Sequence, residues 1–184
     1  MVSSVQFILK EATHMNFEQL SAARYSLRKF SDKPVEAEKL ALILEAGRNA
    51  PTAKNFQPQR IFVLQSAEAL AKADACMMSH FNPPTIIVVT YDPAVSWKRE
   101  HDNKEHGEID AAIVAAQMML QAADLGLGTT YVGMYEPAKL KEAFPEFANL
   151  EIVAMLPLGY PREDARPSRL HTDRIPMDDM VKYL

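Results

Sequence analysis

The 184-residue chain has one cysteine, Cys76, six glycines and one tryptophan. A single cysteine can form neither an intrachain disulfide nor a cysteine-ligated cluster, so the fold must hold together without them. This usage is typical of a reducing compartment, and we expect a cytoplasmic protein. No apolar run reaches the roughly 18–20 residues needed to span a bilayer, so the sequence predicts no membrane partner.

An excess of charge of one sign is also missing. The chain has 20 Lys and Arg against 24 Asp and Glu, which gives a formal net charge of −4. This mildly acidic balance argues against nucleic acid as a partner.

The motifs G-x-x-x-x-G-K-[ST], H-E-x-x-H and C-x-x-C are absent. We interpret His101 and His106 as part of a solvated polar loop, so no metal site is predicted.

What is present indicates one domain of alternating helices and strands. The hydrophobic content of 48% excludes a wholly disordered chain. We expect a single domain over 15–184, because Asn16 is the first clear helix cap, and a loosely ordered extension over 1–14. Periodicity and turn residues predict helices at 16–24, 34–48, 66–79, 108–125 and 136–144, and strands at 60–64, 83–92, 129–135 and 151–161.

The strand at 83–92 and the tail after Pro161 each have a composition that predicts where they lie. The strand at 83–92 is continuously apolar after its prolines, which indicates burial on both faces. After Pro161 the periodicity is weak, so we expect the tail to lie along the body of the protein or across a partner subunit.

The predicted helix at 108–125 is apolar on two sides. Its two faces carry Ile109, Ala112, Ile113, Ala116, Leu120 and Ala123 on one side, and Ala111, Val114, Ala115, Met118, Ala122 and Leu125 on the other. A helix that is apolar nearly all round is buried in a large core or between subunits. In a chain this short, with small alanines that permit close approach, a homodimer interface is the better explanation.

The stretch RYSLRKF places Arg24, Ser26 and Arg28 at alternate positions, so in an extended segment all three point the same way. Two guanidinium groups and a hydroxyl that converge on one spot match a phosphate group. A solvated basic turn after a helix is an equally good interpretation of this stretch taken alone. Near the C-terminus, REDARPSRLHTDR adds Arg166 and Arg169, which alone would indicate a solvated tail.

A long polar loop, NAPTAKNFQPQ, joins the second helix to the first strand. Its primary amides, Asn55 and Gln57, offer both donors and acceptors, which match the alternating N–H and C=O groups of a flavin's pyrimidine edge. Asn55 could instead be a turn former, and Gln57 a polar entry into the strand.

Together with the segments LQAADLGLGTTYVGMY and LPLGYPREDARPSR, these motifs resemble the FMN-dependent nitroreductase family over nearly all of 16–170. The resemblance implies an α+β fold: a three-layer α-β-α sandwich with a central mixed, mainly antiparallel sheet flanked by helices. It also implies a homodimer with FMN sites at the subunit interface. Two departures stand out. Thr52 and Ala53 replace a Ser-Ser pair, and the short segment between Thr90 and Gly107 leaves little chain to cover a substrate.

The resemblance assigns cofactor-binding roles to three groups of residues. The FMN phosphate and ribityl chain would contact Arg24, Tyr25, Ser26, Arg28, Arg166 and Arg169. The pyrimidine edge would be read by Asn55 and Gln57, while Pro51, Thr52 and Ala53 would approach the flavin of the partner subunit. Backbone N–H groups near flavin N5 and O4 would come from Tyr131, Val132 and Gly133.

The implied activity is that of an oxidoreductase with a ping-pong cycle. NAD(P)H would pass a hydride to flavin N5, and a nitroaromatic, a quinone or a similar flat acceptor would then take the electrons. The chemistry resides on the flavin, so no side chain is named as catalytic. Two alternatives stay open: a family relative that carries out reductive dehalogenation or enone reduction, and a flavin-binding module for storage or regulation without significant turnover.

Overall fold

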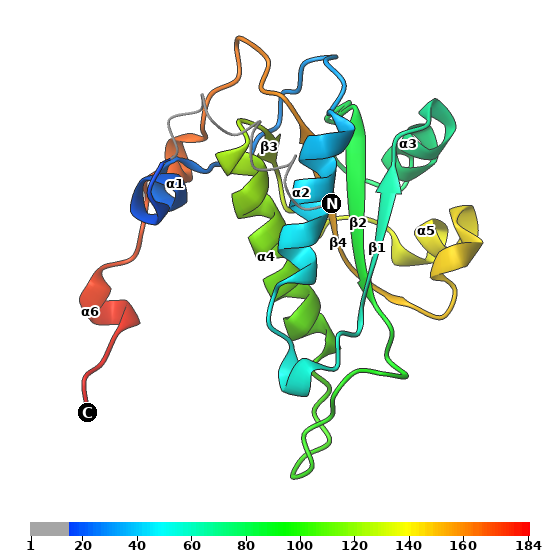
Figure 1. Cartoon of the computed structure of the whole chain (residues 1–184), viewed down its shortest axis with the longest axis vertical. Coiled ribbons are helices and arrows are strands. Elements are labelled where there is room, and N and C mark those ends of the chain that lie inside the picture. The colour runs from blue at the N-terminus through cyan, green and yellow to red at the C-terminus, as the bar shows by residue number, and fades with distance from the viewer. Residues whose placement is uncertain (1–14) are drawn as a thin grey trace, which may run out of the picture.

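Figure 1 shows a computed structural model of the chain, in which residues 15–184 are described. The extension expected at 1–14 lies outside the described residues. The helices are α1 (Phe17–Ala23), α2 (Ala37–Arg48), α3 (Ala67–Asp74), α4 (Gly107–Asp124), α5 (Pro137–Ala143) and α6 (Met177–Met180). Short 3-10 turns are η2 (Ala53–Asn55), η3 (Pro145–Phe147) and η4 (Arg169–His171). The strands are β1 (Gln59–Leu64), β2 (Thr85–Tyr91), β3 (Gly128–Thr129) and β4 (Glu151–Gly159).

Local capping chemistry sets the starts of two helices as predicted. The Asn16 side chain accepts from the Gln19 N–H at 2.9 Å, and the Gln19 side chain accepts from the Asn16 N–H, which completes a capping box. The Ser66 hydroxyl caps α3 by accepting from the Ala69 N–H at 3.1 Å.

Two predicted helix boundaries are wrong because tertiary contacts override the local pattern. Helix α2 begins at Ala37 instead of Pro34, because Val35 is buried in the core from an extended segment. Helix α3 ends at Asp74 instead of near Ser79, because the chain turns inward and Met77 pairs with Tyr135 in a β-bridge.

The four strands form one antiparallel sheet in the order β1-β2-β4-β3. The central strand β2 is buried along its whole length, as predicted from its apolar run. Within 15–184, the parallel pairing is confined to an isolated bridge between Ser26 and Thr129.

The predicted strand at 129–135 is largely wrong, and Pro157 explains the break in its pairing at Thr130. Val132 and Met155 exchange both backbone hydrogen bonds, at 2.9 and 3.0 Å. The next such pair along an antiparallel ladder lies two residues away, at Thr130 and Pro157. Proline has no N–H to donate, so β3 stops at Thr129 and touches β4 again only at the Val132 bridge.

Helices cover both faces of the sheet, which confirms the predicted three-layer α+β sandwich (Figure 1). On one face, α2 and α4 pack on Ile87 and Val89; on the other, α3 and α5 pack on Ile86 and Val88. These β2 side chains alternate between the two core layers, as the period of a strand requires. Helix α2 lies very close to α4 at Gly47. A Cβ added at this position would be 2.7 Å from the Met118 Cγ, so the close approach requires glycine.

The two apolar faces of α4 differ in burial. Ala111, Val114, Ala115, Met118 and Ala122 are buried in the core. On the opposite side, Ile109 and Ile113 remain 41% and 40% exposed. The core therefore accounts for one face and leaves the other free in the single chain. Among residues 15–184, no helix combines the length and the apolar character that a membrane crossing needs.

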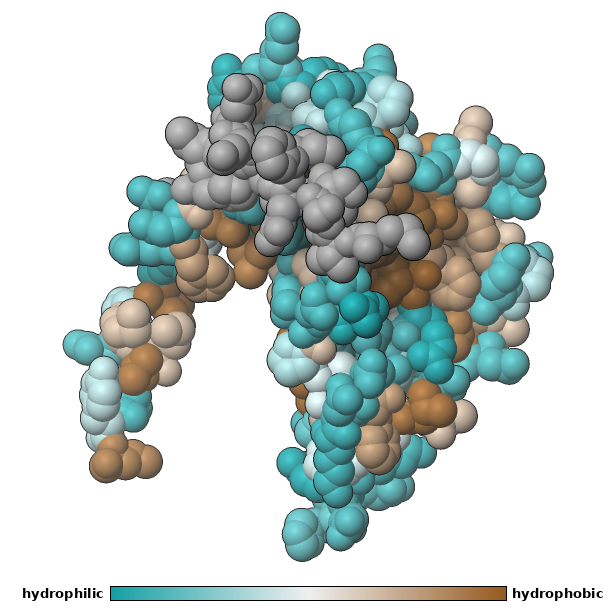
Figure 2. All heavy atoms as spheres, in the orientation of Figure 1, coloured by the Kyte–Doolittle hydropathy of each residue, from teal (hydrophilic) through white to brown (hydrophobic). Residues whose placement is uncertain are grey.

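The last part of the C-terminal segment, around α6, does not follow the body of the protein. In Figures 1 and 2 the chain around α6 stands away from the remainder of the molecule. Its apolar side chains are exposed, including Ile175, Met177, Met180 and Tyr183. The two arrangements expected for the tail therefore apply to different parts. The first part packs along the body, since Ala165 is buried against Leu27 and Phe30. The part around α6 does not, and its packing across a partner subunit stays a prediction.

Candidate functional site

The segment 24–30 lies beside the sheet edge, where Ser26 forms a β-bridge with Thr129 of β3. The Leu27 N–H donates to the Thr129 carbonyl at 2.9 Å, and the Leu27 side chain is buried. Since alternate residues of an extended chain point to opposite sides, Arg24, Ser26 and Arg28 share the side away from Leu27.

The chain after β4 returns to this segment. The Ser31 N–H donates to the Tyr160 carbonyl at 2.9 Å, and the Arg162 N–H donates to the Lys29 carbonyl at 3.1 Å. These bonds place the C-terminal basic stretch beside the N-terminal one. The structure thereby brings together two groups that are separated by about 140 residues in the sequence.

Two adjoining depressions form between these stretches. The first is lined by Ser26, Arg28, Lys29, Asp164, Ala165, Arg166 and Ser168. The second is lined by Arg24, Tyr25, Ser26, Arg28, Ser168, Leu170, His171 and Arg174. Among residues 15–184, no acidic residue lines the second, and on these residues it is the more electropositive of the two.

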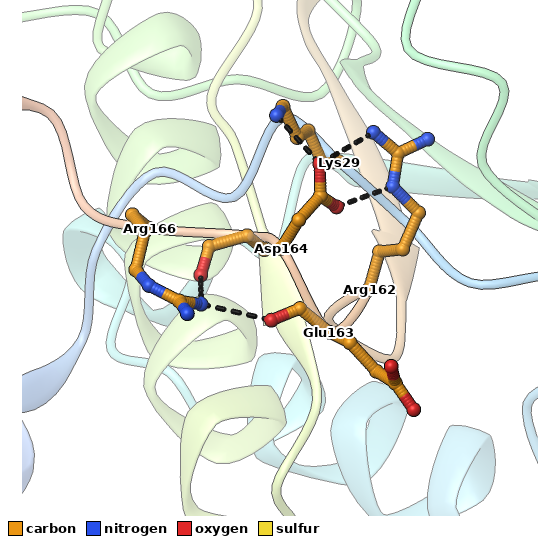
Figure 3. A network of polar contacts seen from close by, with 6 residues as sticks. Lys29, Arg162, Glu163, Asp164 and Arg166 are labelled. Atoms are coloured by element: carbon orange, nitrogen blue, oxygen red, sulfur yellow. Dashed lines mark hydrogen bonds and ion pairs between the residues drawn. The ribbon is translucent and has the colours of Figure 1, made fainter.

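An ion-pair network around Asp164 offsets part of the positive charge in the first depression (Figure 3). Asp164 binds Lys29 at 2.8 Å and also binds Arg162. The Arg162 guanidinium, and then Lys29, hold the pKa of the Asp164 carboxyl well below its usual range. Arg166 donates from Nη1 to the carbonyls of Glu163 and Ala165, at 2.8 and 2.7 Å. Arg166 therefore braces the local turn, whereas Arg28 makes a long 3.3 Å bond to the Ser26 carbonyl.

The structure changes the membership of the predicted basic group. Arg169 begins η4 and does not line either depression, whereas His171 and Arg174 line the second. The Ser168 hydroxyl caps η4 by accepting from the Leu170 N–H at 3.2 Å, and the His171 ring packs edge-on against Tyr25 with centroids 6.2 Å apart. Ser168 as a helix cap is the signal in the sequence that could have indicated this turn.

The polar loop after α2 has an unusual backbone. Lys54, Asn55 and Gln57 have φ values of 47°, 58° and 50°, in the left-handed region that non-glycine residues rarely adopt. Each such residue carries strain on the order of 1–3 kcal/mol, which persists only where surrounding contacts enforce it. The loop therefore holds one particular presentation of its amides.

Hydrogen bonds within and beneath the loop maintain this conformation. The Thr52 hydroxyl accepts from the Gln57 N–H at 3.1 Å, and the Gln57 side chain donates to the Asn55 carbonyl at 3.1 Å. Below them, the Ala53 N–H donates to the Asp110 carboxylate at 2.9 Å. Asn55 and Gln57 are both exposed residues, and the Gln57 amide uses one of its N–H groups on the Asn55 carbonyl.

Of the three backbone N–H groups expected from 131–133, not all are free to contact a ligand. Tyr131 is 43% exposed. Its partial burial, and secondly the charge of Glu108, raises the pKa of its hydroxyl. The Val132 N–H is already bonded to the Met155 carbonyl, so it is not free to contact a ligand. The N–H groups of Tyr131 and Gly133 are left as the candidates in this segment.

Within one chain, the basic depressions lie apart from the polar loop that carries Asn55 and Gln57, which we call the amide loop. The loop is tied to Asp110 near the start of α4, whereas Leu27 is bonded to Thr129, just after the end of α4. Helix α4 has 18 residues, so it is about 27 Å long. The two groups lie toward opposite ends of the same helix (Figure 1). Within 15–184, no group of three or more His, Cys, Asp and Glu side chains could hold a metal ion.

Comparison with known proteins agrees with this architecture. A crystal structure of a nitroreductase family protein from Clostridium difficile 630 is 38% identical, with a TM-score of 0.85, over 92% of this chain and 98% of that one. The FMN-dependent nitroreductase from Clostridium difficile R20291 is 25% identical, with a TM-score of 0.73, over 89% of this chain and 96% of that one. A curated relative named NADH dehydrogenase, from Thermus thermophilus, is 26% identical over an alignment of 208 positions. The alignment covers 94% of this chain and 99% of the relative.

A family model described as the Nitroreductase family matches residues 22–83 and 79–160, which together make up most of the chain. The chain therefore belongs to the nitroreductase family.

Proposed function

We propose that the protein is an FMN-dependent oxidoreductase that carries electrons from NAD(P)H to a flat, electron-poor acceptor. The observation that supports this most directly is the second depression. Its lining includes the arginines Arg24, Arg28 and Arg174 and the serines Ser26 and Ser168, and no acidic residue from 15–184. Guanidinium forks and hydroxyl donors are the groups that bind a phosphate monoester. The donor set therefore fits the FMN phosphate.

The amide loop supplies a second kind of recognition. Asn55 and Gln57 are exposed residues of a loop with a left-handed backbone, and one N–H of the Gln57 amide is bonded within the loop. Each amide offers donors and an acceptor, which suits the pyrimidine edge of an isoalloxazine ring. Because this loop and the basic depression lie toward opposite ends of α4, a flavin bound by both must lie between two chains.

The free face of α4 supports such a pair. Ile109, Ile113 and Ala116 form an apolar strip that the core of one chain leaves exposed. In a two-fold symmetric dimer the same surface packs on itself, so the two α4 helices can run antiparallel. The loop of one subunit then approaches the depression of its partner. The exposed apolar C-terminal segment would lie across the partner in the same assembly.

The chemistry divides between cofactor and protein. When bound, FMN supplies the redox step, since it can accept a hydride from NAD(P)H and deliver electrons to an acceptor such as a nitroaromatic or a quinone. The residues of this chain bind the phosphate, orient the ring through its polar edge and hold both subunits in register. Reductant and acceptor would use one cleft in turn. We assign no side chain as an acid or base.

Spectroscopy tests the proposal. The purified protein is saturated with FMN, freed of excess, and assayed for bound flavin per chain. We expect one FMN per chain, bleaching under anaerobic NADH or NADPH, and recovery of the flavin spectrum on adding menadione or a nitrobenzoate. A protein that retains no FMN would refute the proposal. Bound flavin that neither nucleotide reduces would indicate a storage or regulatory module instead. Recovery with only a halogenated phenol or a cyclic enone would indicate one of the other reductive tasks.

A further inference from the structure

Asp110 connects the amide loop to the core of the protein. Its side chain is 2% exposed, and its Oδ1 accepts the Ala53 N–H at 2.9 Å across 57 residues of sequence. Its other oxygen, Oδ2, is buried without a hydrogen-bond partner among the described residues. A buried carboxylate with one hydrogen bond is a poor choice for stability alone. A role in holding a functional loop explains its presence better.

The loop needs an external anchor because its backbone is strained. Lys54, Asn55 and Gln57 are left-handed within four consecutive positions, directly after Ala53. The Thr52 hydroxyl bond to Gln57 closes the loop on itself but does not fix its place in the protein. The bond from Asp110 does so, because it attaches the first residue of η2 to the first turns of α4.

We propose that Asp110 is a positioning residue for FMN binding. It holds Ala53, and through Ala53 it sets the direction in which Asn55 and Gln57 present their amides. Asp110 itself touches neither cofactor nor substrate. The inference rests on the proposed function, since it concerns how the flavin edge is read. It also places the anchor of the loop one turn from Ile113, on the helix that would form the dimer, so one rigid element sets both the amides and the interface.

Substitutions at both ends of this one hydrogen bond test the inference. Asp110→Ala removes the acceptor, while Asp110→Asn keeps an oxygen that can accept from Ala53. Ala53→Pro removes the donor, and it suits the backbone: Ala53 begins η2, and Thr52 before it has φ −132° and ψ 157°, which a following proline favours. The dissociation constant of FMN is measured for each variant and for Asp110→Ala/Ala53→Pro, by quenching of flavin fluorescence.

Loss of this bond should weaken FMN binding by about tenfold in Asp110→Ala and in Ala53→Pro. Asp110→Asn should stay within about twofold of the wild type, and the double variant should be no weaker than either single variant, because both remove the same bond. Thermal unfolding without FMN checks that each variant folds. Should Asp110→Ala fail to fold, the comparison of Ala53→Pro with Asp110→Asn carries the test.

Three results would overturn the inference: wild-type affinity in Ala53→Pro or in a folded Asp110→Ala, equal weakening in Asp110→Asn and Asp110→Ala, or losses that multiply in the double variant. A wild-type protein that binds no FMN would instead refute the proposed function. Bound FMN in the wild type, with an unchanged affinity in Asp110→Ala, refutes the positioning role alone.

Discussion

Gly128 and Leu27 are packed so closely that a Cβ at Gly128 would lie 2.5 Å from the Leu27 Cδ2 and 2.8 Å from its Cβ. Leu27 is the inward-pointing residue of the segment that carries Arg24, Ser26 and Arg28. Its position, and therefore the direction of those three side chains, depends on the absence of a side chain at Gly128.

Gly128→Ala should consequently damage both stability and FMN binding. The added methyl group forces Leu27 outward, and overpacking of this kind costs about 1–3 kcal/mol of unfolding free energy. Denaturant unfolding measures the loss. Gly133→Ala is the matched control, because a Cβ at Gly133 meets nothing within 4 Å, and its stability should remain within about 0.5 kcal/mol of the wild type. Equal stability of the two variants would contradict this interpretation of the packing.

Arg28 and Arg166, two of the arginines that line the basic depressions, should differ in their effect on FMN affinity. Arg28→Ala removes a guanidinium that has only a long intramolecular bond, so it should weaken FMN binding by about 1.5–3 kcal/mol, the strength of a charge-assisted hydrogen bond. Arg166→Ala should weaken it less, because Arg166 already donates to two backbone carbonyls. Equilibrium dialysis with FMN compares both. Lys72→Ala, which removes an exposed cation from α3, is the control for net charge and should bind as the wild type does. An Arg28→Ala protein that binds FMN as tightly as this control would remove the phosphate assignment.

The two faces of α4 predict opposite outcomes for neighbouring alanines. Ala116→Glu places a charge on the exposed strip, so the chain should stay folded while both dimerisation and FMN binding are lost. Ala115→Glu buries a charge in the core, so it should unfold the protein. Analytical ultracentrifugation and circular dichroism separate the two cases. A flavin-loaded Ala116→Glu monomer would contradict a site shared between subunits.

A polar cluster at Tyr160, directly after β4, predicts a dependence of stability on pH. The Tyr160 hydroxyl donates to Glu36 at 2.7 Å, and Lys33 pairs with the same carboxylate at 3.0 Å. Tyr160 first, then a backbone hydrogen bond and Lys33, lower the pKa of Glu36 from 4.5 to about 2. Because the folded-state pKa is depressed, the unfolded chain binds more protons at this group between those values. Its stabilising effect is therefore present above pH 4.5 and is lost as the pH falls toward 2.

Tyr160→Phe should raise the pKa of Glu36 and flatten this part of the stability profile. Carbon-13 NMR titration of the Glu36 carboxyl gives the pKa directly. Lys33→Ala removes two causes, a hydrogen bond and a charge, each smaller than the Tyr160 hydrogen bond, so the pKa should rise in this variant too. A larger rise in Lys33→Ala than in Tyr160→Phe would show that the ion pair, and not the tyrosine, dominates.

Features with a local cause were predictable from the sequence. Asn16 and Ser66 cap helices through their own neighbours, and the apolar run of β2 requires burial wherever the strand lies. The periodicity of α4 indicated both apolar faces correctly, but it could not indicate which one meets the sheet, since Ala115 and Ala116 are chemically identical. That choice depends on the packing of α2 and the sheet.

Features that depend on chain topology could not be predicted in the same way. Pro157 interrupts the pairing of a segment that is distant in sequence, so the end of β3 is invisible without the register of β4. The inclusion of His171 and Arg174 in the depression follows from the turn at η4. The separation of the amide loop from the basic depressions depends on the length and direction of α4, which motif spacing alone does not reveal.

The most direct test of a flavin site shared between subunits is complementation in mixed dimers. One chain carries Arg28→Ala, which damages the depression, and the other carries Asn55→Ala with Gln57→Ala, which damages the loop. The heterodimer is isolated through two different affinity tags, and its bound FMN is counted. If the site is shared, the unaltered loop of the first chain meets the unaltered depression of the second, and one FMN site is intact. We therefore expect one tightly bound FMN per heterodimer, while both parent homodimers bind weakly. A heterodimer with no tight site would show that each chain builds its FMN site alone, and it would contradict the shared site.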